Sequence, residues 1–295
     1  MTLSLVTIIV PSYNSSAYIE EALNSCLKQD YKNIELLISD DHSSDNTPVK
    51  VNEWLSKHKS AFVNAKFIQQ KENLGVTANT NFLIKEAQGK YIRLLESDDI
   101  LVEDSIKKQI EYVSESNEEI FFLFSDLLIF NGSVQSAKIE KPAKEKFINA
   151  TATEQYEMLL YGQQANGPSV FFHKDTVLNL DGYVGARNCA DWTTVLKLTF
   201  NNIKLHYYPE PLLYYRRHET NISTRENLSW KEISYEMKKI RNTMFIKPEL
   251  KWRDRLYCFQ DLLKAKKKAK HKLTSSEKFS LFSSSKMYRV LQAIT

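Results

Sequence analysis

The segment Gly89-Lys90-Tyr91-Ile92-Arg93-Leu94-Leu95-Glu96-Ser97-Asp98-Asp99 (GKYIRLLESDD) decides how the first half of the sequence folds. Its centre, Tyr91–Leu95, is a short and mostly apolar run, which is typical of a buried strand. Gly89 closes the stretch Val76–Ala87, where apolar residues recur with helical spacing. Three carboxylates then follow the strand within four residues. The pattern from Val76 to Asp99 therefore predicts a helix, a turn, a strand and an acidic loop.

The same alternation of strand and helix extends outward in both directions. Strands alternating with helices of this length predict an α/β fold with a mostly parallel sheet covered by helices on both faces. The expected strands are Leu5–Val10, Ile34–Ser39, Ala65–Gln69, Tyr91–Leu95 and Phe121–Phe124, and the expected helices are Ala17–Gln29, one capped by Asp45 or Asn46 that runs to His58, Val76–Ala87 and Val102–Ser114. The later pattern is less regular and predicts helices at Thr153–Tyr161 and Asp191–Phe200, a strand at Ser169–His173 and a strand pair within His206–Tyr215.

Composition sets further limits on the class of protein. The chain has 295 residues, of which 42% are hydrophobic and 26% charged, so a folded globule is expected rather than a disordered chain. Apolar runs are strand-sized, and the N-terminal one lacks the features of a signal peptide, which favours a cytosolic protein. The three cysteines are widely separated and predict buried thiols. The sequence contains neither a dinucleotide-binding glycine fingerprint nor a P-loop.

Charge divides the chain into two parts. Residues 225–295 contain 18 Lys and Arg against 7 Asp and Glu, a net charge of +11, whereas residues 1–224 carry a net charge of −7. We therefore expect a main domain over 1–224, with a nucleotide-binding half at 1–128 and an acceptor-side half at 129–224, followed by a basic helical extension over 225–295.

Polar loops follow the first four expected strands. The carboxyl ends of parallel strands meet at one edge of a sheet, so these loops should converge there. Glu96, Asp98 and Asp99 would repel one another unless a cation joined them, and such oxygen ligands suit Mg²⁺ or Mn²⁺. The alternative is that these residues cap the helix that follows. Asp40 and Asp41, expected close by after another strand, favour the metal.

Taken together, the motifs resemble those of family 2 glycosyltransferases with the GT-A fold. The resemblance covers roughly residues 4–220 and rests on their order and spacing. The motifs are Val10-Pro11-Ser12-Tyr13-Asn14, Leu37–Asp45, Asn73-Leu74-Gly75-Val76, Gly89–Asp99, and more weakly Gly167-Pro168-Ser169, Asp181-Gly182-Tyr183, Ala190-Asp191 and Tyr215-Arg216-Arg217-His218.

The resemblance implies roles for individual residues. Asp191 matches the general base, and Asp98 matches the carboxylate that holds a metal on the donor diphosphate. Glu96 stands where the family usually has Asp, contacting ribose or metal-bound water, and His218 falls where relatives place a histidine near the metal. The residues expected to bind the nucleotide-sugar are Pro11, Tyr13, Asn14, Asp41, Asn73, Glu96, Ser97 and Asp98, and those expected to hold the metal are Asp98, Glu96 and His218.

Three positions depart from the family pattern. His42 replaces a glycine after the paired aspartates, Thr80 replaces an arginine that faces the diphosphate, and Ala190 replaces a glutamate beside the base. Arg216 or Arg217 could supply the missing cation. From the residues alone, Asp191 could equally cap the helix that it precedes, and His218 could be an ordinary hydrogen-bonded histidine.

These features together predict an inverting glycosyltransferase. It would move a sugar from a nucleotide diphosphate, with UDP favoured, to an acceptor hydroxyl with Mn²⁺ or Mg²⁺ as cofactor; relatives imply a glycan or lipid-linked acceptor in surface polysaccharide synthesis. The alternative is a non-catalytic nucleotide-sugar-binding or membrane scaffold protein with the same fold. Basic and apolar residues interleave in the extension, which favours contact with an anionic membrane, on the inner face of the cell membrane, over nucleic acid.

Overall fold

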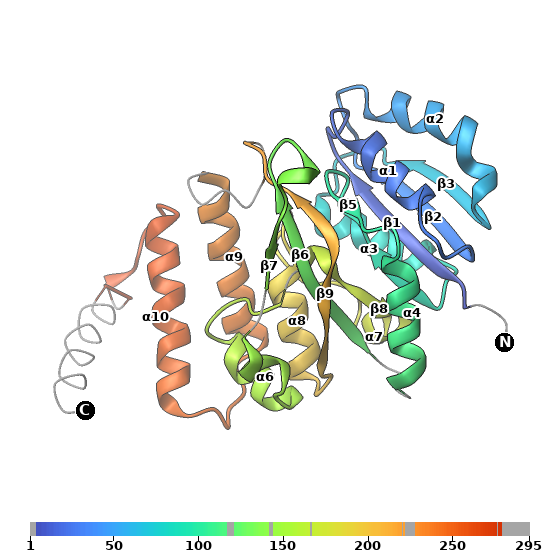
Figure 1. Ribbon diagram of the computed structural model, residues 1–295. Coiled ribbons are helices and arrows are strands. Elements are labelled where there is room, and N and C mark those ends of the chain that lie inside the picture. Colours follow the sequence, from blue (N-terminus) through green and yellow to red (C-terminus); the bar gives the residue numbers. More distant parts are fainter. Residues whose placement is uncertain are drawn as a thin grey trace. The chain divides into compact units, whose positions relative to one another are not determined.

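A parallel sheet forms the first half of the chain (Figure 1). The computed structural model describes residues 4–116, 121–141, 144–165, 167–219, 221, 228–275 and 277–278. Four strands pair in parallel in the order β3-β2-β1-β4, so their carboxyl ends share one edge. The elements of this half are β1 (Val6–Ser12), α1 (Ile19–Leu27), β2 (Ile34–Asp40), α2 (Thr47–His58), the short 3₁₀ helix η1 (Lys59–Ala61), β3 (Asn64–Gln69), α3 (Val76–Glu86) and β4 (Tyr91–Leu94).

The sheet continues with strands of mixed direction. β8 lies antiparallel between β4 and β6, while β9 pairs parallel with β6 and antiparallel with β5. The order across the sheet is β3-β2-β1-β4-β8-β6-β9-β5, with β7 paired to β6. The elements are β5 (Ile100–Leu101), α4 (Ser105–Ser116), β6 (Phe122–Phe130), η2 (Val134–Ser136), β7 (Lys138–Glu140), α5 (Glu145–Ile148), α6 (Ala152–Leu159), η3 (Gly167–Ser169), β8 (Phe171–His173), α7 (Lys174–Leu178), α8 (Asp191–Phe200) and β9 (Leu205–Arg216).

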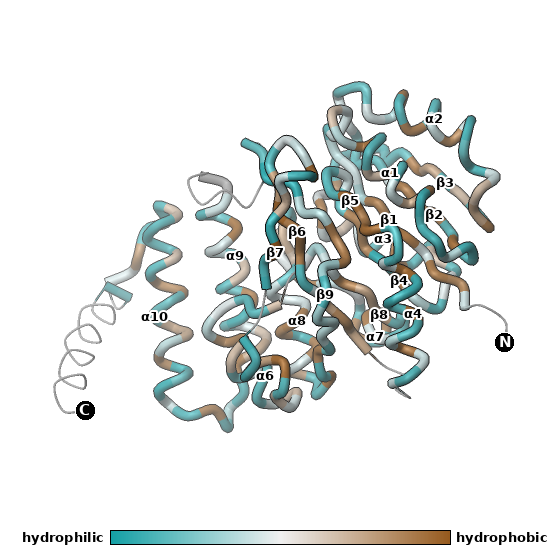
Figure 2. Tube along the Cα trace, viewed as in Figure 1, coloured by the Kyte–Doolittle hydropathy of each residue, from teal (hydrophilic) through white to brown (hydrophobic). Residues whose placement is uncertain are grey.

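Helices cover both faces of the sheet. Alternate residues of β1 and β2, such as Ile8 and Leu36, pack with buried side chains of α1, α2 and α4 in one core. Ile9 and Leu37 point to the opposite face, where α3 packs against the same two strands. Figure 2 shows β1 and β6 coloured mainly hydrophobic, as expected for strands buried on both faces. The predicted fold class is confirmed: an α/β sheet, mostly parallel, with helices on both faces.

Two predicted strands differ from the structure. The expected strand pair within His206–Tyr215 is a single strand, β9, so that prediction was wrong. Pro209 and Pro211 lie within this strand, where the β6–β9 register shifts, and prolines are tolerated at such irregularities. The strand expected at Phe121–Phe124 runs on to Phe130. Of the predicted thiols, Cys26 and Cys258 are buried, and Cys189 is only partly so.

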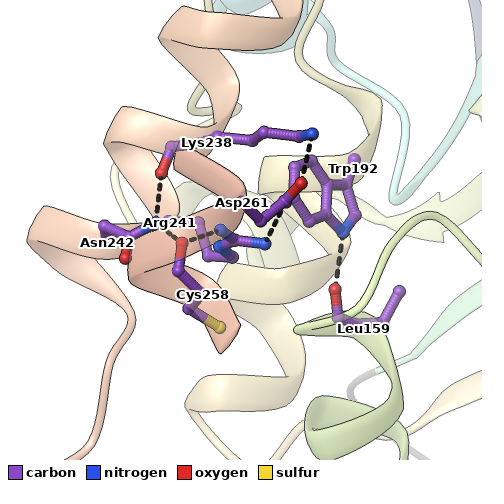
Figure 3. Close-up of polar contacts among 7 residues, drawn as sticks. All are labelled: Leu159, Trp192, Lys238, Arg241, Asn242, Cys258 and Asp261. Carbon is purple, nitrogen blue, oxygen red and sulfur yellow. Dashed lines mark hydrogen bonds and ion pairs between the residues drawn. The ribbon is translucent and has the colours of Figure 1, made fainter. Parts of the chain in front are cut away.

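The chain divides into two units, Met1–Glu219 and Thr220–Thr295. In the second, α9 (Leu228–Met244) lies beside α10 (Trp252–Lys268). Figure 3 shows how they are joined: the buried Arg241 contacts Asp261 at 3.1 Å and donates to the carbonyl of Cys258 at 2.7 Å. No helix in the described part of the chain is long and apolar enough to span a bilayer. The apolar residues expected to interleave with charge from Phe279 onward lie outside the described residues.

Candidate active site

Hydrogen bonds link the loops that follow β1, β2, β3 and β4 at one edge of the sheet. The backbone N–H of Asn14 donates to Ser43 Oγ at 2.8 Å, which joins the loops after β1 and β2. The N–H groups of Leu74 and Gly75 donate to the carboxylate of Asp41 at 2.7 and 2.8 Å, which adds the loop after β3. The hydroxyls of Ser15 and Ser97 lie 2.6 Å apart and add the loop after β4. The predicted donor-site residues therefore do share one edge.

The residues expected to bind the nucleotide differ in how accessible they are. Pro11 is buried at the end of β1, whereas the Tyr13 side chain is 50% exposed beside it. Asn14 is exposed, and its Oδ1 accepts from the N–H of Ser44 at 2.9 Å. Asn73 donates through Nδ2 to the carbonyl of Asp41 at 3.1 Å. Asp41 is almost fully buried and holds the turn that carries Asn73 in place.

The structure shows where the three residues that depart from the family pattern lie. His42 adopts φ = 63°, a left-handed conformation that glycine adopts most easily and that histidine tolerates better than most residues. Thr80 is buried on α3, and Ala190 is buried as the residue that precedes α8. Neither position offers a charged group to the loops at the sheet edge.

The acidic residues after β4 occupy distinct environments. Glu96 and Asp98 remain partly exposed, whereas Asp99 is buried and accepts from the backbone N–H of Arg216 at 2.9 Å. Burial, together with the charges of Asp191 and Asp98, raises the pKa of Glu96 to about 8. Burial and the Asp98 charge also raise the pKa of Asp99 well above its ordinary value. At neutral pH both carboxyl groups therefore favour the protonated form unless a cation is bound beside them.

The end of β9 brings His218 and Arg216 to this acidic loop. His218 Nε2 lies 3.0 Å from Asp98 Oδ2, and its ring packs on that of Tyr18 at 4.7 Å. Arg216 donates to the carbonyl of Asp98 at 2.8 Å and pairs with Glu21 at 2.5 Å. The Arg216 guanidinium is therefore committed to holding the loop and does not stand free in place of the cation missing at Thr80. Arg217 is exposed and pairs with Glu140 at 3.3 Å.

Asp191 is the first residue of α8 and keeps part of its surface exposed. Burial raises its pKa to about 6. It lies near enough to Glu96 for its charge to raise the pKa of that carboxyl group. The backbone of Gly167 packs directly against it, because a Cβ at Gly167 would lie well under 3.0 Å from Asp191 Oδ2 and Cγ. The residue in the capping position is Ala190, so Asp191 is not the N-cap that was considered from the sequence.

The residues around Asp98 have the chemistry of a divalent-cation site. Carboxylate oxygens from Glu96 and Asp98 and the imidazole of His218 are ligands that suit Mn²⁺, and the crowded carboxylates would be stabilised by a cation. Within the part of the chain that the structure describes, the buried Asp99 Oδ2 has no hydrogen-bond partner. Among the described residues, no three His, Cys, Asp or Glu side chains are placed to hold a metal by themselves. Oxygen atoms from a substrate would have to complete the coordination.

One basic residue near the donor loops was missed in the sequence. Arg187 donates to the side-chain oxygen of Asn73 at 2.7 Å, and its side chain crosses Gly75. Thr77 also donates to the carbonyl of Ala186 at 2.6 Å. Gly75 has φ = 88°, a conformation suited to glycine, and the missing Cβ makes room for Arg187. No local pattern around Arg187 signals this long-range contact.

Comparison with known proteins identifies the family. The profile described as Glycosyl transferase family 2 matches residues 7–140. The chain is 31% identical over 229 residues to the Escherichia coli UDP-Glc:α-D-GlcNAc-diphosphoundecaprenol β-1,3-glucosyltransferase WfaP, covering 76% of this chain and 82% of that protein. The chain belongs to glycosyltransferase family 2. It is also 36% identical over 140 residues to WfgD, an E. coli glucosyltransferase of the same description, covering 48% of this chain and about half, 52%, of that relative.

Solved structures agree with this family fold. Staphylococcus aureus TarS, residues 1–349 in complex with UDP, aligns with a TM-score of 0.60 at 19% identity and covers 88% of this chain and 70% of that one. The mannosyltransferase PcManGT from Pyrobaculum calidifontis, in complex with GDP-Man and Mn²⁺, aligns with a TM-score of 0.59 at 17% identity, covering 100% of this chain and 76% of its own. These likenesses establish the GT-A fold of the family 2 chain.

Proposed function

We propose that this family 2 chain is an inverting glycosyltransferase that transfers a sugar from a nucleotide diphosphate to an acceptor hydroxyl. The observation that carries the proposal is the convergence of Asp98, paired with His218, and the partly exposed carboxylates of Glu96 and Asp191 on the edge that the donor loops share. A UDP-sugar is the favoured donor, because the relatives WfaP and WfgD are described as using UDP-Glc and TarS was solved with UDP.

In the proposed reaction Asp191 acts as the general base. The acceptor hydroxyl attacks the anomeric carbon as Asp191 takes its proton, and the bond from that carbon to the diphosphate oxygen breaks on the opposite face. One displacement of this kind inverts the configuration. A pKa of about 6 suits the role, since Asp191 is ionised at neutral pH yet more basic than an ordinary carboxylate.

Binding of the donor falls to the other side chains of the edge. Tyr13 offers an exposed ring on which a base can pack, while Pro11, Asn14, Ser97, Asp41 and Asn73 shape the nucleotide loop. Asp98 and His218, which lie together, would hold Mn²⁺ or Mg²⁺ with oxygen atoms of the donor, and Glu96 would have to move toward them to act as the third predicted ligand. The cation, when bound, offsets the charge that grows on the departing diphosphate.

The acceptor side is formed by the second half of the first unit. A groove of about 400 Å³ is lined by the end of β6, by β7 and by Arg217. Arg217 directly follows Arg216, the last residue of β9, which donates to the carbonyl of Asp98. Its lining includes the apolar Ile129 and Phe130, the basic Lys138 and Arg217, and the acidic Glu140 that pairs with Arg217. Two basic side chains against one acidic one leave the groove with a net positive charge. This mixture suits an acceptor with an anionic group and an apolar part, as in a lipid-linked oligosaccharide of surface polysaccharide synthesis. Contact of residues 225–295 with the inner face of the cell membrane would bring the enzyme to such an acceptor.

A non-catalytic nucleotide-sugar-binding protein is the competing proposal, and release of nucleoside diphosphate separates the two. We expect UDP-glucose with Mn²⁺ to raise the melting temperature, because a ligand that binds only the native state stabilises it. We further expect slow release of free UDP that chelation of Mn²⁺ abolishes. Stabilisation without any release of UDP, with or without an acceptor, would favour the binding protein.

The Asp191→Asn variant tests the base directly. The amide has the same shape but cannot accept the proton, so turnover should fall about 10²- to 10⁴-fold while donor affinity stays within about twofold. Turnover by initial UDP release and affinity by calorimetry provide the two measurements. Wild-type turnover would remove Asp191 from the reaction, and a parallel loss of donor binding would assign it a structural role.

A further inference from the structure

Arg93 is an unusual residue for the centre of a core strand. It lies on β4 three residues before Glu96, and its side chain is 0% exposed. A fully buried arginine is rare because removing its charge from water is costly. Burial lowers the pKa of Arg93 to about 10, with Asp99 acting in the opposite direction, so the guanidinium stays charged at neutral pH.

The guanidinium holds one particular turn. Nη1 of Arg93 donates to the carbonyl of Pro168 at 3.1 Å and to that of Val170 at 2.8 Å. Nε and Nη2 have no hydrogen-bond partner in the described part of the chain. The hydrogen bonds that the guanidinium donates there are therefore the two from Nη1 to this turn. Ser169, between the two carbonyls, is fixed separately to β6, where its Oγ accepts from the N–H of Ser125 at 2.9 Å.

The same turn forms one wall of the Asp191 site. Gly167 begins it, and a Cβ at this position would overlap the Asp191 carboxylate. The backbone at Gly167 therefore fills the space beside the carboxylate and limits the orientations that Asp191 can adopt. The contacts form a continuous path from Arg93 through Pro168 and Gly167 to the carboxylate.

We propose that Arg93 is a positioning residue for Asp191, acting through the turn at Gly167–Val170. This inference rests on the proposed function, in which Asp191 is the general base. A displacement of about 1 Å at a base can cost roughly 100-fold in rate, so a buried clamp on the adjoining turn has a direct effect on turnover.

Two variants perturb the path at opposite ends. Arg93→Lys keeps the positive charge, but the shorter side chain cannot place a nitrogen at the position of Nη1, which donates to both carbonyls. Gly167→Ala leaves Arg93 intact and places a methyl group against the carboxylate. Both should lower the rate of Mn²⁺-dependent UDP release from UDP-glucose about 10- to 100-fold and leave the KM for UDP-glucose nearly unchanged. Ile92→Val, which trims a buried neighbour on β4, is the matched control and should leave the rate unaltered.

A double-mutant cycle distinguishes positioning from general destabilisation. If Arg93 acts through Asp191, Arg93→Lys should cost little further rate in an Asp191→Asn background. Equal costs in both backgrounds would overturn the inference while leaving the proposed function standing. No effect of Asp191→Asn alone would instead overturn the proposed base. Melting temperatures confirm that each variant folds, and a loss of rate matched by Ile92→Val at equal destabilisation would also contradict the inference.

Discussion

At the residue scale, the neighbouring carboxylates of Asp98 and Asp99 lie in different environments. Asp98 remains partly exposed and meets His218, whereas Asp99 is buried and accepts from the backbone of Arg216. The sequence could place both after a strand, and a family resemblance could single out Asp98. Neither the sequence nor the resemblance could reveal that Arg216 pairs with Glu21, since the two residues lie 195 positions apart. Contacts of that range depend on the packing of the whole sheet.

Replacing Asp98 with alanine should remove metal-dependent donor binding. Loss of a metal ligand should cost at least as much as loss of a residue that only orients a ligand, so we expect UDP affinity in saturating Mn²⁺ to fall by about 100-fold or more. Calorimetry with UDP, with and without Mn²⁺, measures the effect. Asp30→Ala is the control, because Asp30 is an exposed carboxylate paired loosely with Lys107 at 3.9 Å. Unchanged affinity in the Asp98 variant would exclude it as a metal ligand.

At the element scale, local signals predicted most helices and failed where tertiary packing decides. The sequence left Asp45 and Asn46 as alternative caps of α2; Asn46 occupies the N-cap position, but the side chain that accepts from the first helical N–H is that of Asp45. Its carboxylate accepts from the N–H of Thr47 at 2.9 Å and from that of Ser16 at 3.0 Å, whereas Asn46 makes no side-chain capping bond. The predicted strand pair is the single strand β9, because pairing with β6 continues past the two register shifts at Asp126, and such long-range pairing leaves no local signal.

Asp45 should contribute to stability in a way that depends on pH. Burial alone would raise the pKa of Asp45, but hydrogen bonds from Thr47 and Ser16 outweigh it and lower the pKa to about 2. A carboxyl group with a depressed native pKa stabilises the fold above its unfolded pKa of about 4, and this contribution disappears as the pH falls toward 2. Asp45→Ala should therefore cost about 1 kcal/mol of unfolding free energy at pH 7.

Urea unfolding of the wild type and the variant from pH 7 to pH 3 measures this difference. The gap should be constant above about pH 5 and narrow below pH 4. Asn46→Ala is the neighbouring control and should show a smaller cost with no such pH dependence. A gap that widens on acidification would contradict the assigned role of Asp45.

At the scale of the whole molecule, we expect the second unit to contact a membrane surface, because it combines positive charge with exposed aromatic side chains. Residues 225–295 carry a net charge of +11, a feature the sequence shows directly. The sequence could not show which apolar residues stay uncovered, because that depends on how α9 and α10 pack. The side chains of Trp252, Tyr257 and Phe259 are 52%, 38% and 40% exposed, and they lie among Lys251, Arg253 and Arg255. Aromatic and basic residues interleaved on a helix suit the interface of an anionic bilayer.

The full chain should therefore bind anionic vesicles in two separable ways. Each Lys or Arg near such a surface contributes about 1 kcal/mol at most, so added salt should weaken binding steeply. Aromatic insertion should leave a salt-resistant remainder, which Trp252→Ser combined with Phe259→Ser should remove. Sedimentation with phosphatidylglycerol vesicles across a salt series measures both parts, with phosphatidylcholine vesicles as the neutral lipid. Val63→Ser is the matched control, since Val63 is 61% exposed in the first unit. Equal binding to neutral and anionic lipid would reject the prediction. So would salt-resistant binding that the double substitution leaves unchanged. Tighter binding to RNA than to vesicles would instead favour a nucleic-acid partner.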